Sequence, residues 1–499
     1  MTRRKKQTVT DIIGNEVEQW QQGEIITIEA GTGVGKSYFV KNTLYEKARR
    51  EGTKILFLVN RTRLKDQFLE EIQKDGKDDV IDIFLYQKVE SRLGREKATT
   101  FKNDYTYIVC DEFHYFLTDS TYNSNTDTSF KLIMSHSSKI RIFMSATADI
   151  TIAFFKFKQI KFRSYSIPHD YSHIKELIFY RHEKVLEKYL SKIRKGQQVI
   201  AFFTKASKAY ELHKRFEDSM FVCAEGNVDY KKYVNKDRVK LMLDSETFEE
   251  KYLFTTSTLD NGINLRSKNM KYIVCDIQDV DTLIQCLGRK RIIDAKDQVT
   301  VVIRNITDKE IGQRIRAKNK IINSAKYLLE NGSIAYMDKY RRNHNNPTIY
   351  VEPNKDRTNP EFFVNELRYF KECSDRNNLE DIREIENGYM EHVKNKLQKE
   401  NYTMLDDTYD KAKSEDYLDS LVGKQLFKDE QKALIKMVNL RDNYNRVQSS
   451  VRLINEYFIQ NSIPYNIRDK NRDNKRKTED NQPNPNFNKT FWTVAKHNY

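Results

Sequence analysis

The sequence is poor in cysteine, proline and glycine, with 5, 7 and 16 of them among 499 residues. The cysteines are odd in number and no two of them stand in a CxxC spacing. We therefore expect reduced thiols, a cytoplasmic location and no zinc site. No run reaches the roughly 18 apolar residues of a membrane span, and the basic start is not followed by an apolar stretch. We expect neither a transmembrane helix nor a signal peptide.

Charge is abundant but unevenly placed. The net charge is +15, and 12% of the residues are aromatic, a content that excludes a disordered or collagen-like chain. Residues 151–300 contain 28 basic and 20 acidic residues, and residues 301–350 contain 10 and 4. Such an excess is expected where a chain faces a polyanion, and a solvated basic surface is the alternative.

Short runs of β-branched and aromatic residues alternate with helix-length segments over the first three hundred residues. Several runs are apolar throughout, which is typical of strands buried on both faces of a parallel sheet. The alternation predicts an α/β fold with two lobes, at residues 1–150 and 151–305, and with a junction at Thr151–His173. The expected strands are Ile25–Glu29, Ile55–Val59, Ile81–Leu85, Tyr107–Cys110, Ile142–Ser145, Leu177–Tyr180, Val199–Phe203, Phe221–Cys223, Leu253–Thr255, Tyr272–Asp276 and Val299–Ile303.

The pattern changes after residue 305, and we expect residues 306–499 to form a mainly helical accessory domain with a basic tail. Apolar residues from Ile311 to Leu329 share one helical face, and Asn331-Gly332 is a stop signal. We expect the basic residues on the other faces to extend a basic track toward Arg342; they include Arg314, Arg316, Lys318 and Lys320.

Two patterns near the end of the chain predict further elements. Apolar residues spaced by three and four favour one bundle helix; they are Leu440, Tyr444, Val447, Val451, Ile454 and Phe458. Residues 462–467 and 490–494 are expected to pair as strands around a basic loop. That hairpin suits either a winged-helix module that grips duplex DNA or a plain capping hairpin, and we favour the capping hairpin.

The sequence Ala30-Gly-Thr-Gly-Val-Gly-Lys36-Ser37 follows an apolar strand and precedes a helical run. Glycines in such a strand-loop-helix context let backbone N–H groups turn toward phosphate oxygens. Lys36 is expected to reach the β- and γ-phosphates, and Ser37 to bind Mg²⁺. The predicted nucleotide-binding residues of the loop are Gly31, Thr32, Gly33, Gly35, Lys36 and Ser37.

A second motif, Asp111-Glu112-Phe113-His114, stands at the end of another apolar strand. A carboxylate at that strand end lies beside the phosphate loop, so Asp111 is expected to bind the metal ion. Glu112 is then placed to activate the attacking water. A third strand ends in Ser145-Ala146-Thr147, whose hydroxyl groups suit a hydrogen bond to His114 or Asp111.

With these motifs in order, residues 8–305 resemble the superfamily 2 helicases of the DExH type, in which two RecA-like lobes clamp ATP and bind a single strand. The segment Asn60–Leu64 resembles the motif that holds the nucleic-acid backbone. Later segments resemble the motifs that contact the strand and complete the ATP site across the cleft. The resemblance assigns nucleic-acid binding to Arg61, Arg63, Gln87, Thr204, Thr255 and Thr256, a place near the γ-phosphate to Gly262, and catalytic roles to Gln285, Arg289 and Arg291, with Lys36, Asp111, Glu112 and His114.

The chain departs from the family's pattern at two places. Asn264 stands where many relatives have aspartate, and Arg289 and Arg291 are two residues apart rather than three. Side chains two apart on a helix diverge by about 200°, so both arginines can serve only if the segment is a loop or a helix start. We expect Lys290 between them to lie on a solvated face.

The resemblance implies an ATP-dependent nucleic-acid helicase or translocase that uses ATP and Mg²⁺. We expect single-stranded or forked DNA as its substrate, in replication, repair or a mobile-element or phage context. The alternatives are an RNA helicase, and a binding protein whose affinity is gated by ATP without strand separation. No membrane contact is expected, and the C-terminal helices are a candidate surface for a protein partner.

Overall fold

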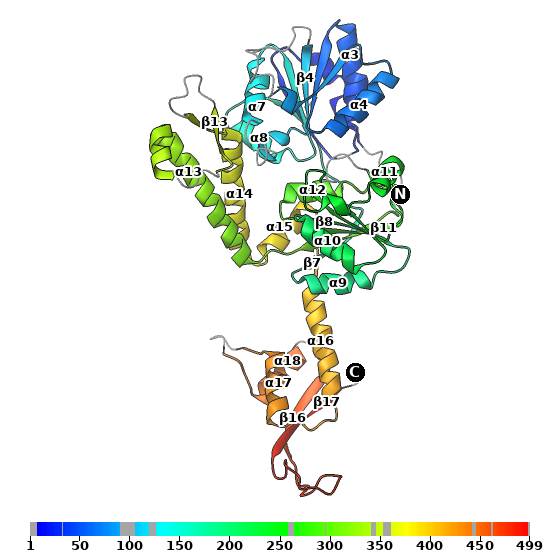
Figure 1. Ribbon diagram of the computed structural model, residues 1–499, viewed down its shortest axis with the longest axis vertical. Coiled ribbons are helices and arrows are strands. Elements are labelled where there is room, and N and C mark those ends of the chain that lie inside the picture. Colours follow the sequence, from blue (N-terminus) through cyan, green and yellow to red (C-terminus); the bar gives the residue numbers. More distant parts are fainter. Residues whose placement is uncertain are drawn as a thin grey trace. The chain divides into compact units, whose positions relative to one another are not determined.

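The computed structural model describes residues 7–31, 33–89, 105–118, 126–257, 264–294, 296–340, 346–352, 361–441, 446–460 and 463–497. The chain divides into two units (Figure 1). The first comprises Met1–Phe179 and Lys192–Thr403, and the second Tyr180–Ser191 and Met404–Tyr499. None of the helices in the described part of the chain has the length and apolar character needed to span a membrane.

A parallel sheet with the strand order β3-β2-β4-β5-β1-β6 forms the first lobe of the first unit. Its central strands are apolar and almost fully buried, as expected of a sheet covered on both faces. The five predicted strands are confirmed. β6 comes from the expected junction instead; it alternates polar and apolar residues over only five positions and lacks the continuous apolar run by which the other strands were predicted. The strands are β1 (Ile25–Ala30), β2 (Lys54–Val59), β3 (Ile81–Leu85), β4 (Tyr105–Asp111), β5 (Ile140–Ser145) and β6 (Arg163–Ile167).

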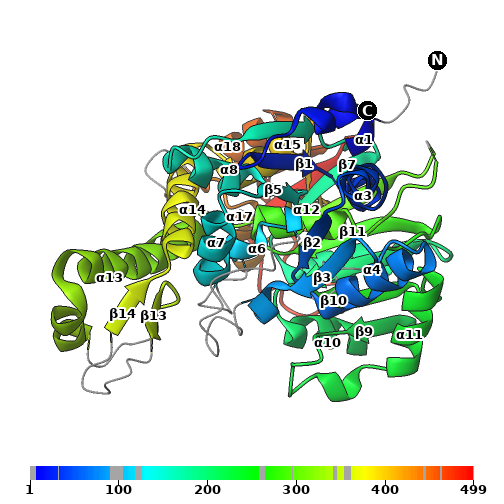
Figure 2. The same cartoon turned by 90° about the horizontal axis from the view of Figure 1, so that it is seen from above.

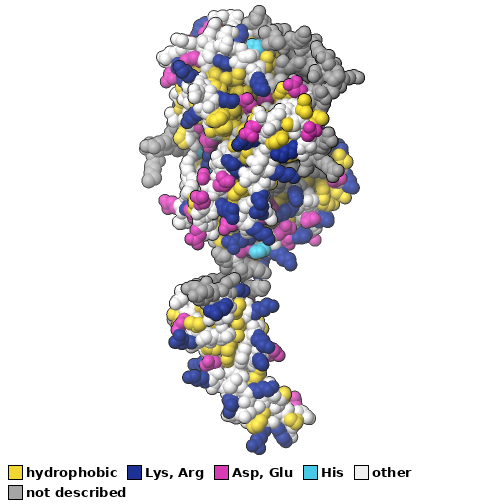
Figure 3. All heavy atoms as spheres, turned by 90° about the vertical axis from the view of Figure 1, so that its left-hand side faces the viewer, with side chains coloured by type: hydrophobic (Ala, Val, Ile, Leu, Met, Phe, Trp, Pro, Cys, Tyr) yellow, Lys and Arg dark blue, Asp and Glu magenta, His cyan; other side chains and the backbone are white. Residues whose placement is uncertain are grey.

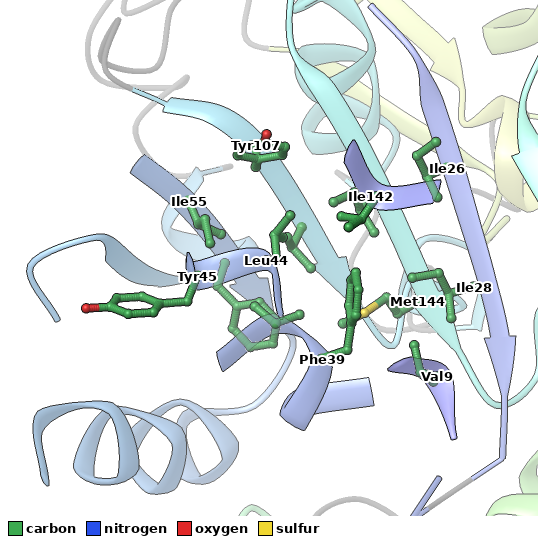
Figure 4. Close-up of a cluster of buried hydrophobic side chains, with 14 of the residues drawn as sticks. Val9, Ile26, Ile28, Phe39, Leu44, Tyr45, Ile55, Tyr107, Ile142 and Met144 are labelled. Atoms are coloured by element: carbon green, nitrogen blue, oxygen red, sulfur yellow. The ribbon is translucent and has the colours of Figure 1, made fainter. Parts of the chain in front are cut away.

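The hydrophobic core of this lobe holds α2, the first helix of the continuous helical run from Lys36 to Arg50, in place. Phe39, at the end of α2, is fully buried and belongs to one cluster with Val9, Ile28 and Met144 (Figure 4). The loop between β1 and α2 is therefore anchored at both ends in the core. The helices of the lobe are α1 (Val9–Ile13), η1 (Gly14–Gln19), α2 (Lys36–Phe39), the π-helical turn η2 (Val40–Leu44), α3 (Tyr45–Arg50), α4 (Thr62–Lys74), α6 (Tyr115–Thr118), α7 (Thr126–Ser135) and α8 (Asp149–Phe157).

The second lobe of the same unit also contains a largely parallel sheet, with the strand order β15-β7-β12-β11-β8-β10-β9, in which β15 is the two-residue strand Thr403–Met404. All six of its predicted strands are confirmed. The lobe boundaries at residues 150 and 305 stay predictions, and α8 and β6 of the first lobe follow residue 150. The elements are β7 (Ile174–Tyr180), β8 (Gln198–Phe203), α10 (Ala206–Arg215), β9 (Ser219–Val222), η4 (Lys231–Tyr233), α11 (Lys236–Ser245), β10 (Tyr252–Thr256), β11 (Met270–Asp276), α12 (Val280–Leu287) and β12 (Val299–Arg304).

Residues 308–396, here called the arm, follow β12 and project from the lobes (Figures 1 and 2). Gly332, the predicted stop, breaks the first helix with φ of 76°. The arm returns to the first lobe, where Leu367 joins its core and Phe370 packs on Phe154. Lys318 is not part of a free basic track, because it bonds carboxylates of the next helix. The arm contains α13 (Asp308–Tyr340), the antiparallel strands β13 (Ile349–Glu352) and β14 (Glu361–Val364), α14 (Glu366–Glu384) and α15 (Gly388–Lys396).

The second unit contains helices and an antiparallel hairpin, which confirms the predicted strand pair. The predicted bundle helix is wrong in its first half. Asn439 ends α17 in a left-handed conformation, and the next helix begins only at Val451. Tyr444 and Arg342 lie outside the described residues. The elements are α9 (Glu183–Ser191), α16 (Leu405–Leu421), α17 (Lys428–Val438), α18 (Val451–Gln460), β16 (Tyr465–Arg472) and β17 (Thr490–Lys496).

Candidate nucleotide-binding site

The glycine-rich loop joins β1 to α2 at the carboxyl edge of the first sheet. Gly33 and Gly35 have φ of 79° and 92°, in the left-handed region that glycine adopts at little cost. A Cβ on Gly33 would lie 2.8 Å from Arg291 Nη1, so a larger residue there would also collide with the second lobe. Thr32 lies outside the described residues.

Lys36 is folded back onto the loop that precedes it. Its ammonium group donates hydrogen bonds to Ala30 O at 2.7 Å and to Gly31 O at 3.4 Å, and the residue is only 9% exposed. The cation therefore lies under the loop, where it faces any anion that the loop holds. Ser37 is exposed and lines the same cavity.

That cavity, of about 360 Å³, is lined by both lobes of the first unit. Residues of the glycine-rich loop, α4 and the end of β4 form one side, and three residues of the second lobe form the other. The lining is Gly33, Gly35, Lys36, Ser37, Tyr38, Phe57, Val59, Leu64, Gln67, Phe68, Glu71, Asp111, Glu112, Asn264, Arg289 and Arg291.

Asp111 and Glu112 stand together at the end of β4. Burial and the neighbouring Glu112 charge raise the pKa of Asp111 to about 7. Burial also opposes ionisation of Glu112, but Lys36, His114 and Arg289 outweigh it and hold the pKa of Glu112 well below its usual range. Among the described residues no donor reaches the buried Asp111 Oδ1. A divalent cation would satisfy that oxygen, so Asp111 and Ser37 fit a Mg²⁺ site.

His114 connects this carboxylate pair to the second lobe. Its Nδ1 lies 2.9 Å from Ser145 Oγ and 3.3 Å from Glu112 Oε2. On its other side, Gln285 Nε2 donates to His114 Nε2 at 3.0 Å and to Thr147 Oγ1 at 3.3 Å. A donor on Gln285 requires an unprotonated His114 Nε2, so the Nδ1–H points toward Ser145 and Glu112. The hydrogen bond expected between His114 and a hydroxyl group is confirmed by the contact with Ser145. Gln285 adds contacts from the second lobe to His114 and to Thr147.

Arg289 and Arg291 both face the cavity because their segment is extended. Helix α12 ends at Leu287, and Leu265 then pairs with the chain around Lys290 through bonds of 2.8 Å to Arg289 O and 2.9 Å from Arg291 N. Side chains two apart on an extended segment point to the same side. The short spacing of the two arginines is thus compatible with one cleft.

The two departures from the family's pattern are in direct contact. Arg291 Nε donates a 2.7 Å hydrogen bond to Asn264 Oδ1. Burial and the neighbouring Arg289 lower the pKa of Arg291 to about 10, so the guanidinium remains charged at neutral pH. The sequence showed Asn264 only as a departure, with no sign that it holds the arginine.

We expected Lys290 to lie on a solvated face, but this prediction is wrong. The residue is buried on the side of the segment opposite to the two arginines. Its side chain is 0% exposed, and its ammonium group donates to Asp297 Oδ2 and to Ser267 O, both at 2.6 Å. The alternation of an extended segment explains the correction. It turns Lys290 inward when both arginines turn to the cleft.

The first-lobe candidates for nucleic-acid binding lie at the start of α4 and after β3. Arg61 and Arg63 are exposed, and Gln87, also exposed, donates a 3.4 Å hydrogen bond to Asn60 O. That bond places Gln87 beside the residue that precedes Arg61. The arrangement gathers three polar side chains, and their role in binding stays a prediction.

The second-lobe candidates are less accessible. Thr204 donates its hydroxyl to Asp276 O at 2.8 Å. Thr255 is 0% exposed and Thr256 is 9% exposed. Burial therefore disfavours the contacts with nucleic acid that we expected of these two side chains. Gly262 lies outside the described residues.

A further polar cluster beside the loop had no signal in the sequence. Burial and the nearby Asp149 raise the pKa of Glu29 to about 7, while Asp149 forms an ion pair with Lys396 of the arm. His169 donates to Ala146 O at 2.7 Å, and a Cβ on Gly31 would lie 3.2 Å from its Nδ1. These residues come from segments too distant in the sequence for any spacing to join them.

Residues 1–81 match the family model "Type III restriction enzyme, res subunit". No curated protein matches the chain. Solved structures with a related arrangement include Dbp5 of S. cerevisiae bound to RNA and ADP BeF3, at 16% identity and a TM-score of 0.42 over 60% of this chain and 83% of that one.

Two further structures show the same level of likeness. A DEAD box protein of Methanococcus jannaschii has 13% identity and a TM-score of 0.35 over 61% of this chain and 88% of that one. Helicase Lhr of Mycobacterium smegmatis, bound to ssDNA and AMP-PNP, has 14% identity and a TM-score of 0.40 over 61% of this chain and 46% of that one.

The family match covers the glycine-rich loop and the first-lobe segment Asn60–Leu64. The structure adds two parallel-sheet lobes in tandem, with the ordered motifs at the carboxyl edge of the first sheet and in the cleft. The DExH subtype depends on residues 111–114 alone. The predicted resemblance is confirmed at the coarser level: the chain has the motif order and the tandem-lobe fold of the superfamily 2 helicases.

Proposed function

We propose that the chain is an ATP-hydrolysing nucleic-acid helicase or translocase that acts in the cytoplasm on single-stranded or forked DNA. One observation carries the proposal. Lys36 and Glu112 of the first lobe and Arg289 and Arg291 of the second line the same cavity. A cation under a phosphate-binding loop, a carboxylate and two arginines are the groups that phosphoryl transfer to water needs.

In this proposal the loop N–H groups and Lys36 hold the β- and γ-phosphates. Glu112 accepts a proton from the attacking water, a role for which its low pKa keeps it ionised. Arg289 and Arg291 lie opposite and stabilise the charge that develops on the transferred phosphoryl group. A Mg²⁺ ion held by Ser37 and Asp111 would neutralise charge on the phosphate oxygens.

In this proposal, ATP hydrolysis is coupled to nucleic-acid binding through contacts that form only when the two lobes are close together. Gln285 reaches His114 and Thr147 across the cleft, so closure orders the residues around Glu112. Arg61, Arg63 and Gln87 are proposed to hold the strand on the first lobe, with Thr204 on the second. Binding of the strand would thereby favour the closed, hydrolysing state.

Two other functions use the same site. An RNA helicase would show RNA as the stronger activator of hydrolysis. A protein in which ATP only gates affinity would bind strands without separating them. The Asp111 and Glu112 pair favours turnover over gating, because a site built only for binding needs no water-activating carboxylate.

The test compares Lys36→Ala and Glu112→Gln in steady-state ATPase assays with single-stranded DNA, duplex DNA and RNA as separate activators. Glu112→Gln should lower kcat by about 10² to 10⁴ while ATP affinity is kept, because only proton acceptance is removed. Lys36→Ala should weaken both ATP binding and turnover. Glu70→Gln, an exposed change on α4, is the matched control.

Equal loss of ATP affinity in both variants would contradict the roles assigned to Lys36 and Glu112. Unwinding of a forked duplex that requires ATP separates a helicase from a gated binder. Stronger stimulation by RNA than by DNA would favour the RNA helicase.

A further inference from the structure

The order of helices and strands in the second unit includes a short strand-like stretch between its first two long helices, α16 and α17. After α16, a short extended stretch around Leu426 pairs antiparallel with Trp492 of β17, through two N–H···O bonds of 2.9 Å. Then come α17 and α18, and the hairpin of β16 and β17. The sequence of helix, strand, two helices, strand, loop and strand is the topology of a winged-helix domain.

Helix α18 and the hairpin form one rigid body. Val451, Ile454 and Phe458 of α18 share a buried cluster with Ile467 and Val494 of the hairpin. Asn455 adds a double hydrogen bond to the backbone of Ile467, accepting from its N–H and donating to its carbonyl oxygen, both at 2.9 Å. The hairpin cannot move without the helix, so the outer face of α18 and the hairpin loop form a single surface.

At α18 that surface is mixed, because Arg452 lies 3.5 Å from Glu456 and Ile459 is 75% exposed. Arg452, Glu456 and Gln460 are exposed along the helix, and Arg446 is exposed in the segment before it. In helix-turn-helix proteins the second helix lies in the major groove and uses residues near its N-terminus to contact base edges. Arg452 occupies that part of α18, which begins at Val451.

The hairpin, in β16 and the loop that follows it, carries the largest group of basic residues in the unit. From Asn466 to Lys489 the hairpin has seven lysines and arginines and four acids. Exposed basic residues follow one another at Arg468, Lys470, Arg472, Lys475, Arg476, Lys477 and Lys489. Dark blue side chains gather on the second unit, including its hairpin tip (Figure 3).

The loop is held in shape by its own contacts. Asn484 donates to Asp473 Oδ2 at 2.8 Å and to Lys475 O at 2.8 Å, and Arg476 lies 5.7 Å from the centre of the Phe487 ring. Lys477 and Pro483 pair as an isolated bridge. A hairpin that only capped a hydrophobic core would need neither this internal order nor so many exposed cations beyond the core.

Charge is also separated along the unit. Residues 405–421 of α16 contain six acids and two bases, whereas residues 424–496 contain eight acids and fifteen bases. A polyanion would be repelled by the first segment and attracted by the second. The charge therefore distinguishes the α18 and hairpin surface from α16.

We propose that the second unit is a winged-helix module that binds duplex DNA, with α18 in the major groove and the hairpin loop, residues 473–489, on the phosphate backbone beside it. The site is separate from the nucleotide cavity and does not depend on ATP, so it goes beyond the proposed function. B-form DNA fits because its major groove admits a helix, whereas the major groove of an RNA duplex is too narrow for side chains to read.

The test measures binding of the full-length protein to a short blunt-ended DNA duplex by fluorescence anisotropy, without nucleotide, at several salt concentrations. Lys475→Gln with Lys477→Gln should reduce the slope of log K against log salt by about 0.9 for each phosphate that the variant no longer neutralises. Arg452→Gln should weaken binding at α18. Lys184→Gln with Lys188→Gln, exposed on α9 of the same unit, is a charge-matched control with no expected change.

A separate variant tells this site from the strand path of the motor. Arg61→Gln with Arg63→Gln should weaken single-strand binding and leave the duplex salt slope unchanged. The winged-helix assignment is overturned if the hairpin variant and the α9 control have the same slope, if the Arg61 and Arg63 variant abolishes duplex binding, or if an RNA duplex of the same sequence competes equally. The changed residues are exposed, so each variant should keep the melting temperature of the unchanged protein. A lower melting temperature would identify a variant that is partly unfolded.

Discussion

A single amide oxygen holds Arg291 over the glycine-rich loop. Asn264 Oδ1 accepts its Nε hydrogen bond at 2.7 Å, and Arg291 Nη1 lies 2.8 Å from the place of a Cβ on Gly33. An amide orients the guanidinium without adding a charge. A carboxylate at position 264 would form an ion pair with it and offset the positive charge that a phosphoryl group is expected to meet.

Asn264→Asp should therefore lower ATPase activity although the side chain keeps its shape. We expect kcat to fall by about tenfold, a fraction of the thousandfold or more that an arginine finger is worth, with a smaller change in KM. Asn269→Asp, exposed a few residues later, is the control for the added charge. Unchanged kcat in the Asn264 variant would mean that Arg291 is not a finger.

Glu29 gives a pH dependence of stability. Burial and Asp149 raise its pKa from 4.5 to about 7 in the folded chain. The folded state then binds the proton more tightly than the unfolded state, so this contribution is full below about pH 4.5 and disappears as the pH rises through 7.

Glu29→Gln keeps the neutral form at every pH and should stabilise the protein at pH 8 by about 1 to 2 kcal/mol, a shift reduced by partial exposure and by Lys396. It should have no effect near pH 4.5. Thermal unfolding at both pH values measures the difference, with Glu46→Gln, exposed on α3, as control. Equal shifts at the two pH values would reject a titrating Glu29.

Among the elements, those with strong local patterns were predictable. The buried strands of both sheets are continuous apolar runs, and the glycine-rich loop has a fixed spacing between a strand and a helix. β6 was missed because its five residues lie at the edge of the sheet and lack a continuous apolar run. The pattern from Leu440 to Phe458 predicted one helix, but Leu440 follows the end of α17 and packs against the core that α18 fills, while Val447 is exposed.

Contacts between distant segments were beyond the reach of any local pattern. From the sequence, Arg289 and Arg291 had to lie outside a helix interior if both were to serve, and the structure meets that condition through pairing with Leu265, earlier in the chain, which no local pattern could predict. The buried ion pair of Lys290 and Asp297 follows from the same pairing. Charge alone suggested a solvated face there, since sequence shows a lysine but not the carboxylate that folding brings to it.

Across the whole first unit, the arm connects structures that belong to different lobes. Its helix α14 is rooted in the core of the first lobe through Leu367, and it presents Lys371 to the start of α12 in the second. Lys371 is buried, 3.1 Å from Asp375 and 3.8 Å from Asp279. Since α12 leads to Gln285 and Arg289, the arm supports the helix on which the cleft depends.

The environment of Lys371 is acidic enough that the ammonium group is required. Burial disfavours its charge, but Asp279, Asp375 and Asp281 outweigh burial and raise the pKa of Lys371. Burial and the charge of Asp279 raise the pKa of Asp281 to about 6 even with the lysine present. Without the cation, Asp375 would keep its ion pair with Lys318 and Asp279 its hydrogen bonds from Thr282, but the like charges of Asp279 and Asp281 would lose their nearest common cation.

Lys371→Met should therefore destabilise the first unit by about 1 to 3 kcal/mol, less than the cost of breaking a fully buried ion pair, because Asp279 is 44% exposed and Asp375 keeps Lys318. The destabilisation should be larger at pH 8 than at pH 5, because removing the cation raises the carboxylate pKa values further and protonation then relieves the repulsion. The first thermal transition measures it at both pH values. Lys326→Met removes an exposed i,i+4 pair with Glu330 and should change stability by less than about 0.5 kcal/mol. If the two variants melt alike, or if the destabilisation by Lys371→Met is the same at both pH values, the arm does not hold α12 by charge.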